Sequence, residues 1–177
     1  MTNTSRKVLV AYATRAGSTA GVAERVAEVL NRSGFAATAV RVNEVRDTAP
    51  YDAVVLGSSV RAGKLKPDAL KFLDKNKADL NAKPFAAFIV CLTMKASDDK
   101  SRAAASAYLD PVRLQVKPLS EGLFAGALNP DKLGLVERTI MKAMKAESGD
   151  FRRWDEVEAW AATLAPLFAA GRAADGR

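Results

Sequence analysis

Two spacings of apolar residues alternate along this chain. Short, nearly continuous apolar runs, such as KVLVAYA at residues 7–13 and PFAAFIVCL at residues 84–92, are typical of strands buried on both faces of a sheet. Between these runs, apolar residues recur every three or four positions, as Val22, Val26 and Val29 do, which predicts amphipathic helices. The predicted strands cover residues 7–13, 36–42, 52–58, 84–92 and 119–126.

Capping and breaking residues bound the predicted helices. Gly34 follows the first helix as a stop signal, Pro67 suits the first turn of the second, and Pro111 follows the third. Asp155 is the expected N-cap of the last helix, with Glu158 three residues later. The predicted helices cover residues 17–33, a stretch from residue 67 that includes Leu70 and Leu73, and residues 98–109, 132–145 and 155–170. The apolar stripe of the fourth consists of Leu133, Val136, Ile140 and Met144.

Strands that alternate with helices predict an α/β fold, a doubly wound parallel sheet of five strands with helices on both faces. The sequence shows no linker and no internal repeat, so we expect a single domain over residues 1–170 and a frayed tail over residues 171–177. In such a sheet, ligands bind at the carboxyl ends of the strands, beside the point where the strand order reverses. The loops after the first, third and fourth strands are therefore where a site is expected.

The inventory of side chains excludes several kinds of catalytic centre. The 177 residues include no histidine and one cysteine, so neither a Ser-His-Asp nor a Cys-His centre can be built, nor can a histidine-based zinc site. Cys91 lies within an apolar strand, where a buried, unreactive thiol is expected. No metal-ligating or catalytic side chain is predicted. A bound cofactor is the expected source of the chemistry, because the side chains are poorly suited to proton transfer near neutral pH.

The formal net charge of +7 favours anionic partners. The simpler interpretation is a basic surface that is solvated and has no specific partner. No block of like charges forms a polybasic tail, and no nucleic-acid partner is predicted. The longest apolar stretches, residues 84–92 and 159–170, are shorter than the roughly 18 residues that a membrane-spanning helix needs. Residues 1–7 do not resemble a signal peptide. We expect a cytoplasmic protein that can make peripheral contact with the inner membrane face.

The loop after the first strand has the composition of a phosphate site. Residues 14–19, TRAGST, lead from a strand into a helix N-terminus and carry three hydroxyls and one glycine. Free amides, the positive end of the helix dipole and these hydroxyls suit a phosphate. The alternative is an ordinary helix start, capped by Ser18 or Thr19. The spacing in residues 57–64 does not match a nucleoside-triphosphate loop, and no G-x-G-x-x-G follows the first strand, so a mononucleotide is the expected ligand.

The segment Tyr12–Thr19 resembles the phosphate loop of flavodoxins, and further segments resemble the flavodoxin-like, menaquinone-dependent protoporphyrinogen oxidases. This resemblance implies a flavodoxin-like sheet with strand order 2-1-3-4-5. The chain departs from that branch between Ala127 and Trp154, where it lacks the usual long segment rich in aromatic residues and arginine. The matching segments are TRAGST at residues 14–19, VVLGSSVRAG at residues 54–63, FAGAL at residues 124–128, and ERTIMKAM at residues 137–144 followed by WD at residues 154–155.

FMN is the cofactor that the resemblance implies. The phosphate would lie at residues 14–19, and two later loops would enclose the isoalloxazine ring, with Val60, Leu92 or Met94 as apolar cover. Gly63 would permit close backbone approach to the ring. Two roles are open for Arg61. It could pair with an anionic substrate such as a porphyrin propionate, or it could be an exposed loop arginine without a function in binding. The implied cofactor-binding residues are Thr14, Arg15, Ala16, Gly17, Ser18, Thr19, Ser59, Val60, Arg61, Ala62, Gly63, Leu92, Thr93, Met94 and Lys95.

The resemblance implies an FMN-dependent oxidoreductase that passes electrons from a reduced substrate, with protoporphyrinogen IX as a candidate, to a quinone. In this reading the flavin does the chemistry and the protein orients it. A basic surface would help docking at an anionic membrane. The alternatives are a flavodoxin-type electron carrier without its own substrate, whose family members are usually acidic, and a flavin-free module on the same fold.

Overall fold

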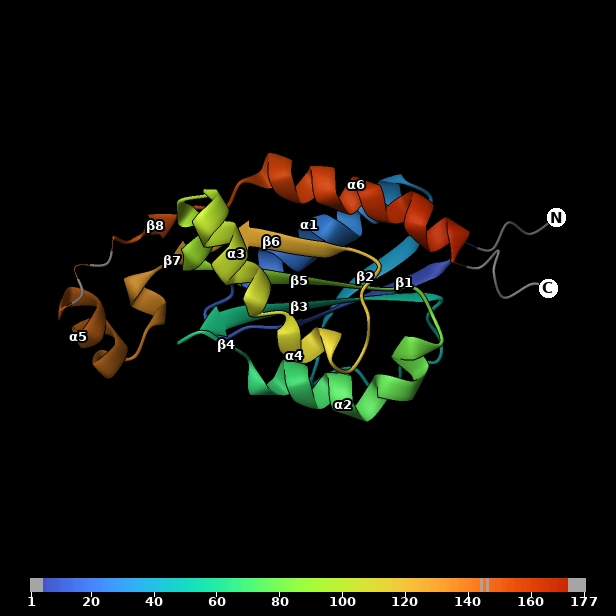
Figure 1. Ribbon diagram of the computed structural model, residues 1–177, viewed down its shortest axis with the longest axis horizontal. Coiled ribbons are helices and arrows are strands. Elements are labelled where there is room, and N and C mark those ends of the chain that lie inside the picture. The colour runs from blue at the N-terminus through green and yellow to red at the C-terminus, as the bar shows by residue number, and fades with distance from the viewer. Residues whose placement is uncertain (1–4, 144, 146, 172–177) are drawn as a thin grey trace.

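A parallel sheet with helices on both faces forms the body of the protein (Figure 1). The computed structural model describes residues 5–143, 145 and 147–171. The parallel strands lie in the order β2-β1-β3-β5-β6, and the short strand β4 pairs antiparallel with β3. The fold class is therefore confirmed. The predicted order 2-1-3-4-5 corresponds to β2-β1-β3-β5-β6, because the short strand β4 was not predicted and shifts the numbers of the last two strands by one. The bounds are β1 (Lys7–Ala13), β2 (Ala36–Arg41), β3 (Ala53–Arg61), β4 (Lys64–Leu65), β5 (Phe85–Cys91) and β6 (Glu121–Ala125).

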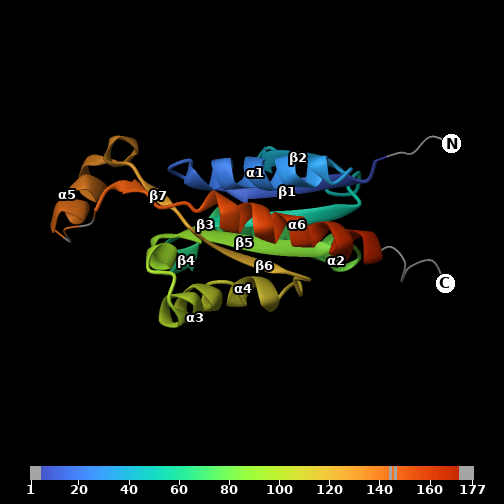
Figure 2. The ribbon, with the colours of Figure 1, turned by 90° about the horizontal axis from the view of Figure 1, so that it is seen from above.

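The helices fall into two layers and one outlying element. Helices α1 and α6 pack on one face of the sheet, and α2, α3 and α4 contribute to the core on the other (Figure 1), so that α1 and α6 overlie the strands when the molecule is seen from above (Figure 2). The α-helices are α1 (Ser18–Arg32), α2 (Pro67–Asn81), α3 (Asp99–Ala107), α4 (Asp110–Arg113), α5 (Leu135–Ala143) and α6 (Trp154–Ala170), and the 3-10 helices are η1 (Leu92–Lys95) and η2 (Pro130–Lys132).

Neighbouring residues of each central strand enter different cores. Leu9 belongs to the core beneath α2, whereas Val10, next along β1, belongs to the core beneath α1 and α6, and both are fully buried. This two-sided burial explains why the strands are continuous apolar runs. Gly57 in β3 leaves room for the tip of the Phe88 ring, because a Cβ at residue 57 would stand 2.1 Å from Phe88 Cζ. No helix in the described part of the chain is long and apolar enough to cross a membrane.

Two helix boundaries differ from the prediction. The third predicted helix, residues 98–109, ends at Ala107 as α3, and a further short helix, α4, follows from Asp110 with Pro111 in its first turn, where its missing N–H costs nothing. Helix α6 begins at Trp154, with Arg153 as N-cap, so the prediction of Asp155 as N-cap is wrong. Asp155 lies in the first turn instead, where its charge still complements the helix dipole.

Residues 127–150 leave the sheet as a separate excursion, called here the α5 excursion. Its neck is an antiparallel pair of short strands, β7 (Ala127–Leu128) and β8 (Gly149–Asp150), and both views show α5 standing apart from the layered body (Figures 1 and 2). Helix α5 is shorter than the predicted 132–145 helix, and Met144 of its stripe lies outside the described residues. The side chains of Val136 and Ile140 are 72% and 52% exposed, so this stripe does not join either core.

One carboxylate fastens the α5 excursion to the loops of the sheet. Glu137 forms ion pairs with Arg15, at 2.8 Å, and with Arg61. It also accepts a hydrogen bond from the backbone N–H of Gly134, at 3.0 Å. This amide hydrogen bond, followed by the two guanidinium charges, lowers the pKa of Glu137 below its ordinary value of 4.5, although partial desolvation opposes the shift. A single side chain thus joins α5 to the loops after β1 and β3.

Acidification should release this attachment. Because the pKa of Glu137 is depressed in the folded protein, the contribution of the ion pairs is present above pH 4.5 and is lost as pH falls through the folded value. An NMR titration of the Glu137 carboxyl carbon should give a midpoint below 4.5. The double variant R15Q/R61Q should raise that midpoint, whereas R32Q, whose arginine pairs with Glu158, should leave it unchanged. A midpoint at or above 4.5 in the unmodified protein would contradict the assignment.

Candidate functional site

The carboxyl ends of the central strands bring three loops to one edge of the sheet. The register pairs Ala13 with Ser58, and Ser59 with Val90, so the segments that follow β1, β3 and β5 emerge side by side. All fifteen cofactor-binding residues predicted from the sequence belong to these segments or to the end of β3. This is the edge at which doubly wound sheets bind their ligands.

The loop after β1 is a tight turn that exposes helix amides. Gly17 has φ +89°, a left-handed conformation that favours glycine, and its N–H donates to Thr14 Oγ1 at 3.1 Å. Gly17 is also the N-cap of α1 and supplies no side-chain cap, so the alternative of Ser18 or Thr19 as the cap is wrong. The first amides of α1 therefore lack a side-chain acceptor at the positive end of the helix dipole.

Thr19 carries a polar atom that lacks a partner. Its side chain is fully buried, and its Oγ1 makes no hydrogen bond within the described part of the chain. An unsatisfied buried hydroxyl costs about 1–3 kcal/mol, so such groups are rare and usually meet a ligand or water. A phosphate oxygen at the start of α1 would supply the missing acceptor. The loop therefore fits a phosphate-bearing cofactor.

A cleft of about 410 Å³ opens beside this loop. The turn at Gly17 and Ser18 forms one side, and the neck of the α5 excursion forms the other. The charged side chains that line it are Lys132, Asp150 and Arg152. The sequence analysis missed all three, because more than a hundred residues separate them from the loop and no local pattern links the two segments.

The second loop is a two-residue β-hairpin turn between β3 and β4. Val60 pairs with Leu65 and Arg61 with Lys64, which leaves Ala62 and Gly63 as the turn. Both turn residues have positive φ, +48° and +72°, as turns that match the twist of a hairpin require. Gly63 adopts this conformation easily, whereas Ala62 pays a strain of about 1 kcal/mol. The rigid turn holds its peptide groups at the edge of the site.

The third loop is the 3-10 helix η1. Met94 is fully buried, so it cannot cover a bound ring, whereas Leu92 is 43% exposed and Val60 is partly buried. Neither residues 59–63 nor residues 92–95 include an aromatic residue, but the structure places one between the two loops. Tyr108 Oη lies 3.3 Å from Thr93 Oγ1, and Tyr108 Cε1 lies 3.8 Å from the position of a Cβ on Gly63. Tyr108 thus joins the second and third loops.

Residues 147–153 contact the third loop through Lys95 and the backbone of Met94. Lys95 pairs with Glu147 and lies 4.4 Å from the centre of the Phe151 ring. Arg153 donates to the carbonyl of Met94 at 2.9 Å. Cys91, at the end of β5, is buried, and desolvation raises the pKa of its thiol, as expected for an unreactive cysteine. The described residues contain no cluster of three side chains that could hold a metal ion.

Relatives matched over most of their length include proteins named protoporphyrinogen IX dehydrogenase [quinone]. The protein of Escherichia coli (strain K12) is 27% identical over 174 residues, which cover 91% of this chain and 96% of that protein. The protein of Leishmania major is 28% identical over 185 residues, which cover 94% of this chain and 78% of that protein.

Solved structures show the same fold. A flavodoxin from the domain Archaea superposes with a TM-score of 0.57 at 16% identity, and covers 92% of this chain and 99% of its own. The flavodoxin of Streptococcus pneumonia TIGR4 gives 0.57 at 17% identity, with 93% and 98% covered.

The sequence profile of the Flavodoxin domain family matches residues 9–155, which include the three loops and the whole α5 excursion. The orphaned hydroxyl of Thr19 and the free amides beside it fit the phosphate of the cofactor that this family binds. The chain therefore belongs to the flavodoxin domain family, and its cofactor is FMN.

Proposed function

We propose that this protein is an FMN-dependent oxidoreductase that passes electrons from a reduced porphyrinogen to a quinone. The observation that carries the proposal is the α5 excursion, which Glu137 fastens to Arg15 and Arg61 at the edge of the site. The excursion would stand beside the exposed edge of the flavin and offer a surface that a substrate larger than the ring can contact. The names of the relatives matched over nearly the whole chain supply the substrate and the acceptor.

The proposed position of FMN follows the three loops. Its phosphate lies against residues 14–19, and its ring lies between the hairpin turn at residues 59–63 and η1 at residues 92–95. When bound, FMN supplies the hydride and electron transfer that the side chains of this protein cannot. The protein orients the ring through backbone groups of the two loops and excludes water with Val60 and Leu92.

Arg61 is the proposed contact for a carboxylate of the substrate. Its side chain is 53% exposed and shares Glu137 with Arg15, so two guanidinium groups face one carboxylate. The mouth therefore keeps an excess positive charge, which favours an anionic side group such as a porphyrin propionate.

The second candidate is an electron carrier without its own substrate, which the flavodoxin structural neighbours favour. Anaerobic reduction of the FMN-loaded protein distinguishes the two. Protoporphyrinogen IX should bleach the flavin absorbance, and added menaquinone should restore it, with protoporphyrin fluorescence rising in step. If only a partner reductase, and not the porphyrinogen, reduces the flavin, the proposed oxidoreductase function is wrong and the electron-carrier function is supported.

The phosphate position predicts opposite effects of one substitution. T19V removes the unpartnered hydroxyl, so without cofactor it should leave the free energy of unfolding unchanged or raise it by about 1 kcal/mol. The same change should weaken FMN binding about tenfold, because a hydrogen bond to the phosphate is lost. Urea unfolding and quenching of FMN fluorescence measure the two effects. T38V, at an exposed threonine of β2, serves as the control. Loss of stability with unchanged FMN affinity would place the phosphate elsewhere.

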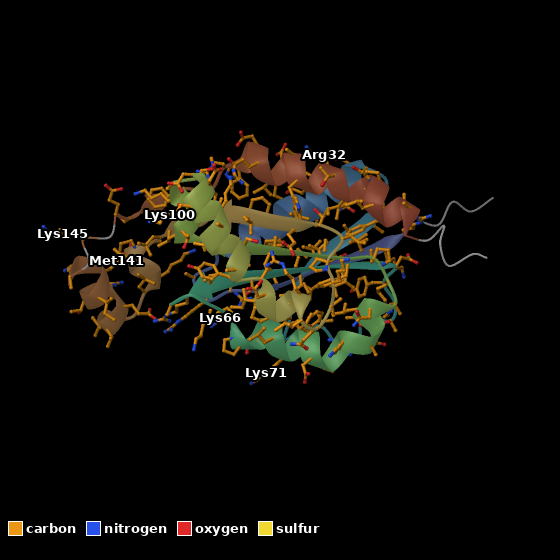
Figure 3. The ribbon with its side chains drawn as sticks, viewed as in Figure 1. Arg32, Lys66, Lys71, Lys100, Met141 and Lys145 are labelled. Atoms are coloured by element: carbon orange, nitrogen blue, oxygen red, sulfur yellow. The ribbon has the colours of Figure 1, made fainter. Side chains whose placement is uncertain are left out.

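We propose an anionic membrane surface as a further partner, because a quinone acceptor resides in the bilayer. Helix α5 exposes Leu135, Val136 and Ile140, with Arg138 on the same helix. Figure 3 shows Lys145 at the outer edge of the excursion, away from the sheet. Exposed apolar side chains with neighbouring cations suit the boundary between lipid head groups and acyl chains. The protein would then work from the cytoplasmic side of the membrane without spanning it.

Sedimentation with vesicles tests this contact. The protein should bind vesicles of phosphatidylserine and phosphatidylcholine, and not of phosphatidylcholine alone. V136D/I140D should lower the partition coefficient roughly tenfold, because two apolar side chains no longer enter the bilayer. L114D changes an equally exposed leucine at the end of α4 and should have little effect. Equal loss in both variants would show that α5 is not the contact.

A further inference from the structure

We infer that Lys132 pairs its ammonium group with the phosphate of FMN, and that this ion pair couples cofactor binding to the α5 excursion. The inference rests on the phosphate position proposed above. It concerns a residue of the excursion, outside the three loops, that the sequence pattern did not select.

The structure places Lys132 directly over the phosphate loop. Lys132 Nζ lies 3.6 Å from the position of a Cβ on Gly17, the N-cap of α1. Both residues line the cleft of about 410 Å³. A ligand that accepts hydrogen bonds from the first amides of α1 would therefore come within reach of the ammonium group.

Of the two described cations that line the cleft, Lys132 has no anionic partner, whereas Arg152 pairs with Asp150. Its ammonium group makes no ion pair and no hydrogen bond within the described residues. The neighbouring cations are each paired with a carboxylate: Arg15 and Arg61 with Glu137, Lys95 with Glu147, Arg138 with Asp131 and Arg152 with Asp150. Within the described lining of the cleft, Lys132 is therefore the cation whose charge no carboxylate compensates.

The surroundings of Lys132 favour an anion in the cleft. Arg152 contributes a second cation, which Asp150 holds through Nε at 2.8 Å and which stacks 4.7 Å from the centre of the Trp154 ring. Its Nη1 reaches the carbonyl of Ser18 at 3.4 Å. The cleft therefore combines two cations, one carboxylate and the positive end of a helix dipole. This excess of positive charge is unfavourable without an anion, and a phosphate dianion compensates it.

The same contact would fix the position of α5. Lys132 ends η2, and Arg138 of α5 donates to the carbonyl of Pro130, the first residue of η2, at 2.7 Å. The phosphate, the lysine, η2 and α5 thus form a continuous series of contacts. Cofactor that carries a phosphate should hold the excursion against the sheet, and cofactor without one should not.

Comparison of FMN with riboflavin isolates the phosphate contribution. The dissociation constants should be measured by quenching of flavin fluorescence for the unmodified protein, K132A and K142A. K132A should weaken FMN binding about fivefold and leave riboflavin binding unchanged. Salt at about 0.5 M should reduce the difference in FMN affinity between the unmodified protein and K132A, because it screens the ion pair. K142A removes another exposed lysine of the excursion that does not line the cleft, and should bind both flavins as the unmodified protein does.

Hydrogen exchange supplies a readout that does not depend on activity. FMN should slow the exchange of amides in residues 129–143 of the unmodified protein, and riboflavin should not. In K132A, saturating FMN should lose this protection, whereas in K142A it should keep it. Thermal unfolding of the three proteins without flavin shows whether K132A remains folded.

The outcomes separate this inference from the proposal on which it rests. If the unmodified protein binds FMN and riboflavin equally well, the proposed phosphate position fails. If it prefers FMN but K132A keeps the full preference and the full protection of residues 129–143, the phosphate position stands and the role of Lys132 is overturned. K132R should retain most of the preference, because it keeps the positive charge.

Discussion

Burial of the central strands on both faces is the constraint on which the rest of the structure depends. Because Leu9 and Val10 enter different cores, β1 can neither slip by one residue nor turn over without exposing apolar side chains. The register of β1 with β2 and β3 then determines where residues 14–19 leave the sheet. The position of the uncapped amides at the start of α1 is a consequence of this packing.

The parts of the protein that depend on local pattern could be predicted from the sequence. The strand β1, the helix α1 and the loop of residues 14–17 between them follow from periodicity and from residue types that are adjacent in the chain. The α5 excursion could not be predicted in the same way, because its apolar stripe resembles that of a core helix although Val136 and Ile140 are exposed. A stripe shows that a helix has an apolar face, but it does not show which surface that face meets.

Contacts between distant segments account for the rest of the site. The bond from Tyr108 to Thr93 and the approach of Lys132 to Gly17 each join residues that no spacing rule relates. The capping error at Asp155 has a different cause. Asp155 and Glu156 both suit the first turn, and the interaction of Arg153 with Glu156 and with Met94 selects the earlier start. The contact with Met94 joins residues that lie far apart in the chain, so no local capping pattern could show it.

The neck of the excursion has a consequence for how such a protein can evolve. Residues 127–150 leave and rejoin the sheet through the short strands β7 and β8, and no described residue of this range belongs to either core. Insertions or deletions beyond the neck would therefore change the surface beside the carboxyl ends of the strands at little cost to folding. Natural selection can alter this appendage while the parallel sheet is inherited unchanged.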